Sequence, residues 1–504
     1  MTIEEERTHL REQVAQRDER IQQLEAALEQ QRDERIQQLE AALEQQGILM
    51  QQMHTHIGSL TQQVQALQER QAKDSHNSSL PPSSDRFTRK TRSLRKKSEK
   101  KAGGQEGHRG TSLAWSSLPD EIIEQGVEQC EACQHDLRDV AACQVERRQV
   151  HDVPPPRRLV QEYRAQHKQC PMCQHITVAR FPQQVAAPMQ YGPTIGAVAV
   201  YLVQQQLLPL ARAAEVMGDL LGVQMSEGTI CTLIQRCASN LADVEQHIKA
   251  ALIKAAVIHQ DETGLSVQGK RSWMHTTSTP TLTHYHVDAS RGHAALEAIG
   301  ILPQFHGISI HDRWRSYFLY GCEHALCIVH LLRELVFLAE EQHVGWAADL
   351  TELLLDMKAA TEQARAEGKR WLHPLEVVAW EAAFLRVLDD GDRLTPRATA
   401  PPGKKGRCPQ SAARNLLDSL RTHQQAVFCF LEDLRVDFDN NLAERDLRMI
   451  KVQQKVSGCF RSLAGAQAFS RIRGYVSTLR KQGLPLLSAL QTTLCGHPVL
   501  PSFQ

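Results

Sequence analysis

The stretch AAVIHQDETG, residues 255–264, decides the fold class of this chain. Its apolar start is typical of a buried strand. The acidic pair Asp261 and Glu262 follows, and Gly264 predicts a turn. The stretch therefore predicts a buried strand that ends where two carboxylates begin, and these either close a turn or hold a metal ion.

A second stretch repeats this arrangement. In GISIHDRWRSY, residues 307–317, an apolar strand leads into His311 and then Asp312, and Trp314 and Tyr317 follow on the next turn. The repetition predicts a second strand with an aspartate at its exit.

A third acidic position lies on a predicted helix in DFDNNLAERDLRMIK, which ends at Lys451. With Asp439 or Asn440 as the N-cap, Glu444 shares one face of this helix with Arg448 and Lys451. Two strand-end aspartates and one helical glutamate supply the hard oxygen ligands of a two-magnesium phosphoryl-transfer site, because Mg²⁺ needs only one or two carboxylates per ion. Each acid alone is more often a turn, cap or surface residue, so the hypothesis depends on the whole constellation.

The length and composition limit the protein classes that fit. A chain of 504 residues is too long for one core and predicts two to four domains. β-like segments at 250–320 precede Leu/Ala/Glu-rich segments at 325–400, so we expect a mixed α/β core with a helical insertion.

The acidic, polar start does not resemble a signal peptide, and the longest apolar run, IGAVAVYLV, is too short to span a bilayer. We therefore expect a cytoplasmic protein whose 13 cysteines are thiols or metal ligands, not disulfides.

The N-terminal region contains an exact duplication. Residues 16–30 and 31–45 are the same letters, QRDERIQQLEAALEQ, and each copy places one Ile and two Leu at helical spacing. This pattern predicts a self-associating coiled coil over residues 1–72, and a single solvated helix is the alternative.

A linker and a basic stretch come next. HNSSLPPSSD, residues 76–85, is typical of a linker, and residues 86–109 carry ten Lys or Arg against two Glu. We expect this stretch to be disordered until it contacts DNA phosphates, and a solubilising tail is the alternative. Its predicted DNA contacts are Arg86, Arg89, Lys90, Arg92, Arg95, Lys96, Lys97, Lys100 and Lys101.

Two CxxC pairs predict a zinc site. Cys130 and Cys133 form the first pair, and Cys170 and Cys173 form the second. Each pair can present two thiolates on one edge of a tetrahedron, so two pairs complete a four-sulfur structural site. Two unrelated thiol pairs, or a redox pair, are the alternatives.

The region around residues 194–240 is predicted to be helical. LARAAEVMGDLLGVQMSEGTICTLIQRC has the pattern of a helix, a turn at Gly222 and a second helix capped by Ser226. The pattern fits a DNA-binding helix-turn-helix and an ordinary helical hairpin equally well.

Taken together, these motifs resemble the transposases of the insertion-sequence 66 family, from about residue 76 to the C-terminal region. The shared pieces, in order, are NSSLPPSSD, GGQEGHRG, the paired CxxC segment, LPLARAAEVM…GVQMSEGTI, HQDETG, HDRWRSY, CIVHLLREL and DFDNNLAERDLR. The resemblance implies a ribonuclease-H-like DDE core with the acidic triad Asp261, Asp312 and Glu444, which binds Mg²⁺ or Mn²⁺. Glu262 is then a neighbour within the motif and not a ligand.

The resemblance also extends to Cys327 and His330, which match a CxxH motif of several DDE transposase groups. We interpret this motif as structural or close to DNA. A second metal site that includes Cys322 and His324 is a weaker alternative.

The resemblance implies a bacterial DNA transposase that binds element ends and target DNA and catalyses metal-dependent strand cleavage and strand transfer. Expected partners are further copies of the chain, held through the coiled coil, and accessory proteins of the same element. We expect the protein in the cytoplasm, at the nucleoid when bound to DNA, with Arg313, Arg445 and Arg448 as further DNA contacts.

The expected domains are a coiled coil (1–72), a flexible basic linker (73–112), a zinc-binding module (113–182), a helix-turn-helix-like region (190–245), the ribonuclease-H-like core (250–480, with a helical insertion at about 325–430) and a C-terminal tail (481–504).

Two other functions fit parts of the sequence. One is a catalytically inactive DNA-binding regulator derived from a transposase, and the other is a plain ribonuclease-H-like nuclease. The intact acids disfavour the regulator. The zinc module, the helix-turn-helix pattern and the coiled coil disfavour the nuclease.

Overall fold

The computed structural model describes residues 3–73, 77, 113–153, 156, 158–182, 184–399 and 408–503. The predicted basic stretch and most of the predicted linker before it lie outside the described residues. The chain divides into two compact units, 1–92 with 336–344, and 93–335 with 345–504.

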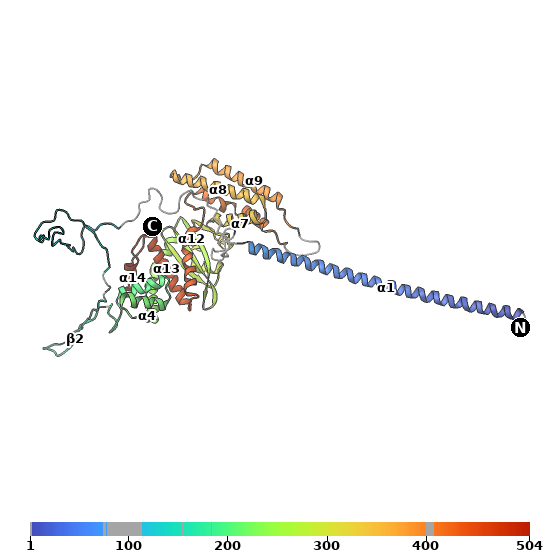
Figure 1. Cartoon of the computed structure of the whole chain (residues 1–504), viewed down its shortest axis with the longest axis horizontal. Coiled ribbons are helices and arrows are strands. Elements are labelled where there is room, and N and C mark those ends of the chain that lie inside the picture. The colour runs from blue at the N-terminus through green and yellow to red at the C-terminus, as the bar shows by residue number, and fades with distance from the viewer. Residues whose placement is uncertain are drawn as a thin grey trace. The chain divides into compact units, whose positions relative to one another are not determined.

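The first unit is dominated by α1 (Ile3–Ala72), a continuous helix of 70 residues (Figure 1). The predicted helical spacing is therefore confirmed over the whole repeat. The apolar side chains of the two copies are 45–67% exposed, and these are Ile21, Leu24, Leu28, Ile36, Leu39 and Leu43. Such a stripe on a solvated helix is what a partner helix covers in a coiled coil, but the coiled coil itself stays a prediction.

In the second unit, a helical region precedes the sheet in the sequence. Its elements are α2 (Pro193–Val200), the π-helix η2 (Tyr201–Gln205), α3 (Leu210–Leu221), α4 (Glu227–Asn240) and α5 (Ala242–Ile253). They share one apolar core with α13 (Leu463–Lys481) and α14 (Leu486–Leu494). The last of these helices lies within the predicted C-terminal tail, so part of that tail is a packed helix.

The predicted helix–turn–helix outline is present in α3 and α4. The first helix ends at Gly222, which has a φ of 62°, a left-handed value that glycine adopts readily. The Ser226 hydroxyl accepts a hydrogen bond from the Thr229 N–H at 3.1 Å and so caps the second helix.

The centre of the second unit is a five-stranded mixed sheet with the order β5-β4-β3-β6-β7. The strands are β3 (Val257–Val267), β4 (Lys270–Ser278), β5 (Thr283–Asp288), β6 (Ile308–His311) and β7 (Glu323–Leu326). The first three pair antiparallel, whereas β6 runs parallel to both β3 and β7. The prediction of a mixed α/β fold is confirmed.

The predicted end of the first strand is wrong. β3 continues through Asp261 and Gly264, because β4 stays paired along it to its last residue. The turn comes instead at Gln268 and Gly269, whose φ values of 52° and 75° are those of a two-residue hairpin turn. The short strand β7 was not predicted from the sequence.

Helices cover the sheet and extend beyond it. α12 (Asn441–Ser457) contacts β3 and β4, and α13 contacts β5. The Leu265 and Val267 side chains of β3 pack with Leu447 and Ile450 of α12 in one apolar cluster. One face of α12 is therefore apolar and buried against the sheet.

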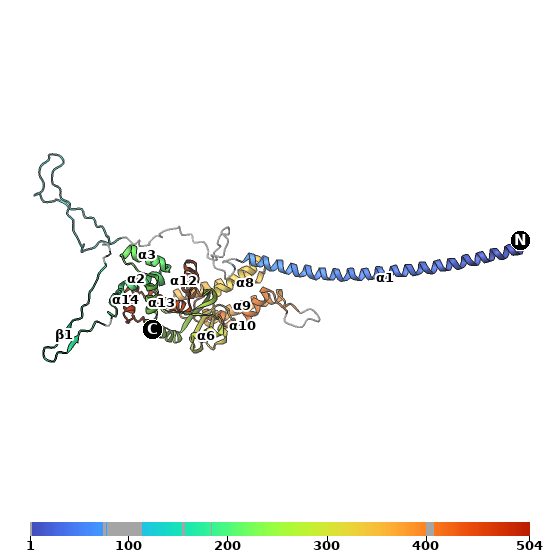
Figure 2. The ribbon, with the colours of Figure 1, turned by 90° about the horizontal axis from the view of Figure 1, so that it is seen from below.

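The segment between β7 and α12 is helical, as predicted for the insertion. Its helices are α7 (Ile328–Glu341), α8 (Gly345–Ala366), α9 (Pro374–Leu394), α10 (Ala412–Thr422) and α11 (Gln424–Glu432). The two longest, α8 and α9, pack side by side (Figures 1 and 2). The short elements before β7 are α6 (His293–Ile299) and the single turns η3 (Leu302–Gln304) and η4 (Tyr317–Leu319).

The segment 113–182 has little regular structure. Its described part contains only β1 (His167–Gln169) and β2 (Ile176–Val178), which pair antiparallel. Large apolar side chains such as Ile122, Val150 and Leu159 are exposed there. The described part of this segment therefore has no apolar core of its own. Among all residues that the structure describes, no helix is both long and apolar enough to cross a membrane.

Gly307 offers a test of the central strand pairing. A Cβ at this position would lie 2.5 Å from the Ala256 carbonyl oxygen and 2.8 Å from that of Ala255. Gly307→Ala should therefore push β6 away from β3 and lower the free energy of unfolding by about 1–3 kcal/mol, as overpacking does. Urea unfolding measures this change.

The matched control is Gly321→Ala, because a Cβ at Gly321 has nothing within 4 Å. Equal stability of the two alanine variants would contradict the close approach of the chain segments at Gly307.

Candidate active site

The register between β3 and β6 brings the two predicted aspartates to the same level of the sheet. The parallel pairing ends at His259 and Ile310. Asp261 and Asp312 each lie two residues beyond that last pair. Asp312 directly follows β6, as predicted, whereas Asp261 lies within β3, where only β4 remains beside it.

Strand alternation separates the side chains of the acidic pair Asp261 and Glu262. Asp261 shares a strand face with Leu265 and Val267, the face that α12 covers. Glu262 shares the opposite face with Ile258. The two neighbouring carboxylates therefore point to different sides of the sheet.

Glu444 enters the site from the first turn of α12, and Asn440 fixes the start of that helix. The buried Asn440 side chain donates a hydrogen bond to the Gln260 carbonyl at 2.7 Å, and its oxygen lies 3.1 Å from His259 Nδ1. Both contacts are to β3, immediately before Asp261. The helix that carries Glu444 is therefore tied directly to the strand that carries Asp261.

The neighbouring acids act on the carboxyl group of Asp261. Desolvation, followed by the negative charges of Glu262, Asp312 and Glu444, raises the pKa of Asp261 well above its ordinary value. The Glu262 N–H donates to Asp261 Oδ1 at 2.8 Å and opposes this shift in part. Negative charge that is concentrated and incompletely balanced is what a divalent cation neutralises, so the residues fit such an ion.

Arg291, which was not predicted from the sequence as a site residue, contacts two acids at the sheet edge. Arg291 Nε donates to Glu262 at 2.6 Å, and Arg291 Nη2 lies 3.8 Å from Asp312. Its guanidinium lies 3.9 Å from the Trp314 ring centroid. Glu262 also accepts a hydrogen bond from the Tyr317 hydroxyl, and its side chain is only 2% exposed. Glu262 is therefore occupied by protein partners.

The predicted DNA-contacting arginines that the structure describes differ in whether they are exposed or already paired with another residue. Arg445 and Arg448 are exposed on α12. Arg313 is ion-paired with Glu334 of α7. Lys451, on the same helix face as Arg448, donates to the Gly264 carbonyl of β3 at 3.0 Å.

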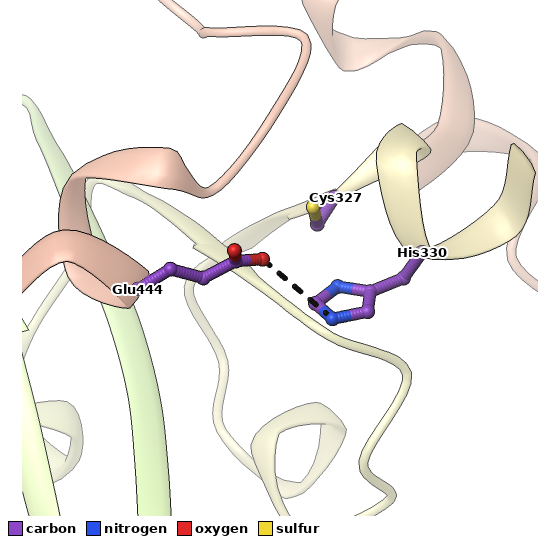
Figure 3. A group of neighbouring side chains, drawn as sticks. All are labelled: Cys327, His330 and Glu444. Atoms are coloured by element: carbon purple, nitrogen blue, oxygen red, sulfur yellow. Dashed lines mark ion pairs between the residues drawn. The ribbon is translucent and has the colours of Figure 1, made fainter. Parts of the chain in front are cut away.

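Glu444 also belongs to a second group of side chains (Figure 3). One possible ligand atom each from Cys327, His330 and Glu444 lies within 4.8 Å of the others, and no other such group of three occurs among the described residues. His330 Nε2 is 3.7 Å from Glu444 Oε1. Burial raises the pKa of the Cys327 thiol to about 12, and the charge of Glu444 adds to this shift. Desolvation lowers the pKa of His330.

This group differs from the weaker prediction that joined the CxxH motif to Cys322 and His324. His324 Nδ1 lies 3.0 Å from His311 Nε2, and His324 Nε2 lies 3.1 Å from the Tyr320 carbonyl oxygen. Both ring nitrogens of His324 are thus engaged. The long sequence separation between the CxxH motif and Glu444 concealed their contact.

The two CxxC pairs form matching turns. The Cys130 N–H donates to the His135 carbonyl at 2.9 Å, and the Cys170 N–H donates to that of His175 at the same distance. Backbone N–H groups and the second thiol of each pair lower the pKa of Cys130 and Cys170. Both turns thus favour thiolates. The four cysteines are not brought together as one group in the described chain, so the zinc site stays a prediction.

Comparison with known proteins identifies the family. The model described as "Transposase IS66 family" matches residues 188–468, more than half of the chain, and includes all three predicted acids. A second model, described as a family of unknown function (DUF6444), matches residues 2–114. No curated protein matches the chain.

The raised pKa of Asp261 predicts a gain of stability in Asp261→Asn at neutral pH. The folded chain holds the Asp261 proton more tightly than the unfolded chain, so its stability falls as the pH rises from the ordinary carboxyl pKa through the raised one. Asparagine carries no charge and escapes this loss. Urea unfolding between acid and neutral pH should show a gain that shrinks as the pH falls.

The control is Asp349→Asn, which changes an exposed aspartate on α8 and should show no such pH-dependent gain. An Asp261→Asn chain that is no more stable than the parent at neutral pH would show that the Asp261 charge is already compensated.

Proposed function

The chain belongs to the IS66 family of transposases, and on this premise we propose that it cleaves DNA at the ends of an insertion sequence and joins those ends to target DNA. The observation that carries the proposal is that Asp312 and Glu444 lie close enough to Asp261 for their negative charges to raise its pKa. These residues come from β3, the end of β6 and the first turn of α12. We propose that they form the acidic triad of a ribonuclease-H-like core.

Two features of the fold support this assignment. The first aspartate lies on the central strand of a mixed sheet, and the second lies at the exit of the neighbouring parallel strand. The glutamate lies on a helix that packs on the same sheet face. The three carboxylates are not all within 4.8 Å of one another, and ligands of two ions about 4 Å apart need not be.

In this proposal the triad holds Mg²⁺ or Mn²⁺. When bound, such ions activate the attacking oxygen and stabilise the leaving oxygen in an in-line displacement at phosphorus. The residues of the chain position the ligands. Asn440 fixes the start of α12 against β3, and Glu262 with Tyr317 holds Arg291 beside Asp312. The positive charge of Arg291 offsets part of the negative charge beside Asp312 and leaves the Asp261 carboxylate available to an ion.

Other parts of the chain fit DNA handling. Exposed Arg445 and Arg448 lie on the helix that carries Glu444, where they would contact phosphates beside the reacting strand. We propose that α3 and α4 act as a helix-turn-helix, that the basic stretch contacts phosphates, and that α1 pairs chains. The exposed apolar stripe of α1 supports the last assignment.

The acidic residues supply the test of the enzymatic proposal. Asp261→Asn, Asp312→Asn and Glu444→Gln each keep the side-chain shape and remove the charge that binds metal. Each should reduce cleavage by more than the 10–100-fold typical of losing an outer-shell partner, with DNA binding retained. The assay uses purified full-length chain, labelled duplexes carrying the DNA that flanks its gene, and Mg²⁺ or Mn²⁺, with nicking and strand joining read on gels.

Asp349→Asn serves as the matched control and should cleave like the parent. Near-parental cleavage by one triad variant would remove that residue from the triad. Binding to the flanking DNA without any cleavage by the parent would favour the catalytically inactive regulator.

We also propose that the two CxxC turns jointly bind structural zinc. Because the described part of residues 113–182 has no apolar core, metal binding would supply the energy for its folding. Replacing Cys130 and Cys173 with serine should remove about one zinc per chain and increase proteolysis within this segment. Replacing the exposed Cys231 and Cys495 should remove none. Equal zinc content in all three chains would argue against the site.

A further inference from the structure

The Cys327, His330 and Glu444 side chains meet at the junction of three elements. Cys327 lies between the end of β7 and the start of α7, His330 lies in the first turn of α7, and Glu444 lies in the first turn of α12. Figure 3 shows the thiol, the imidazole and the carboxylate converging on one space. A thiol, an imidazole and a carboxylate are the three side-chain types that bind Zn²⁺ in proteins.

The spacing within the group fits an ion better than a hydrogen bond. The 3.7 Å between His330 Nε2 and Glu444 Oε1 is too long for a direct hydrogen bond. Two ligands of a tetrahedral ion with bonds of about 2.0–2.3 Å lie roughly 3.3–3.7 Å apart. The observed separation therefore already matches two ligands of one ion.

The polar atoms of the group are incompletely satisfied by protein. His330 Nδ1 is buried and has no hydrogen-bond partner among the described residues. Cys327 Sγ accepts the Asn440 N–H at 3.2 Å and lies at the N-terminal end of α7. Backbone N–H donors and a helix N-terminus both favour a thiolate over a thiol. These contacts only partly offset the burial that raises the pKa of the Cys327 thiol to about 12, so the thiol releases its proton only when a cation binds.

We propose that Cys327, His330 and Glu444 form a binding site for one thiophilic divalent cation of the Zn²⁺ class. The site is distinct from the paired aspartates but shares Glu444 with them. Three protein ligands leave a fourth position for water, and the Cys327 proton passes to solvent when the ion binds. Mg²⁺ is disfavoured, because a thiolate and an imidazole are softer than the oxygen ligands that it prefers.

The shared carboxylate has a consequence that rests on the proposed function. A Glu444 oxygen bound to a thiophilic ion is withdrawn from the ion of the triad. Zn²⁺ should therefore inhibit Mg²⁺-supported cleavage, with Cys327 and His330 setting the zinc concentration at which inhibition occurs.

Cobalt spectroscopy tests the site without requiring activity. The full-length chain with Cys130, Cys133, Cys170 and Cys173 replaced by serine is titrated with Co²⁺, which reports thiolate ligation by charge-transfer absorption and tetrahedral geometry by its visible bands. We expect both signals to saturate at about one equivalent of Co²⁺, the stoichiometry of a single closed ligand set. Cys327→Ser should abolish the charge-transfer band, and His330→Ala should weaken binding by at least about 10-fold.

Two variants serve as controls for the cobalt signal. Cys322→Ser changes a buried thiol at the opposite end of β7, and Asp261→Asn changes the other proposed ligand set, and both should keep the signal. If the four-serine chain does not fold, the parent-minus-Cys327→Ser difference spectrum of the chain with intact CxxC pairs gives the same readout. Absence of a thiolate band, its survival in Cys327→Ser or its loss in Asp261→Asn would each overturn the site.

Zinc titration of Mg²⁺-supported cleavage tests the sharing of Glu444. Each chain is compared with its own activity without zinc. Cys327→Ser should require at least about 10-fold more Zn²⁺ for half-inhibition, and Cys322→Ser should not. If all chains are half-inhibited at the same Zn²⁺ concentration, the two sites do not share Glu444. A parent chain without any cleavage would refute the proposed function and leave the cobalt result to decide the metal site.

Discussion

The parallel pairing of β3 and β6 is the constraint on which the candidate site depends. Only three residue pairs make this contact, from Val257 with Ile308 to His259 with Ile310. A shift of one residue would move one aspartate to the other sheet face and separate it from its partner, because side chains alternate along a strand. Gly307 lies at the start of this pairing and permits the close approach of the Ala255 and Ala256 carbonyls. The geometry of the acids is thus set by backbone contacts several residues away.

The second constraint is the attachment of α12 to the sheet through Asn440. This buried side chain bonds to β3, and its backbone N–H bonds to Cys327 before α7. One residue therefore joins the strand of Asp261, the helix of Glu444 and the CxxH motif. The same junction explains why the charge of Glu444 acts both on Asp261 and on the Cys327 and His330 pair. Since the Glu444 carboxyl group has two oxygens on a flexible stem, we propose that its orientation decides which of the two proposed ligand sets it joins.

Local patterns predicted the helices and singled out Asp261, Asp312 and Glu444 as candidates, but they did not predict the contacts that connect these elements. The 70-residue helix α1, the turn at Gly222 and the apolar face of α12 follow from helical spacing and capping residues. The continuation of β3 past Asp261 was missed because the acidic pair looked like a strand end, whereas the decisive signal was the hairpin turn at Gln268 and Gly269. Strand β7 is short and lacks β-branched residues. Arg291, Asn440 and the contact of His330 with Glu444 depend on residues far apart in the chain, which no local pattern reports.

The central claim is that Asp261, Asp312 and Glu444 jointly bind a divalent cation, and iron-mediated cleavage of the protein tests it most directly. Fe²⁺ bound in place of Mg²⁺ generates hydroxyl radicals that cut the backbone nearest the ion, and mass spectrometry locates the cuts. If the three acids hold one site, cuts fall near all three of them, and excess Mg²⁺ suppresses these cuts together. Cuts that omit the segments of Asp261 and Asp312, or that excess Mg²⁺ leaves unchanged, would contradict this claim.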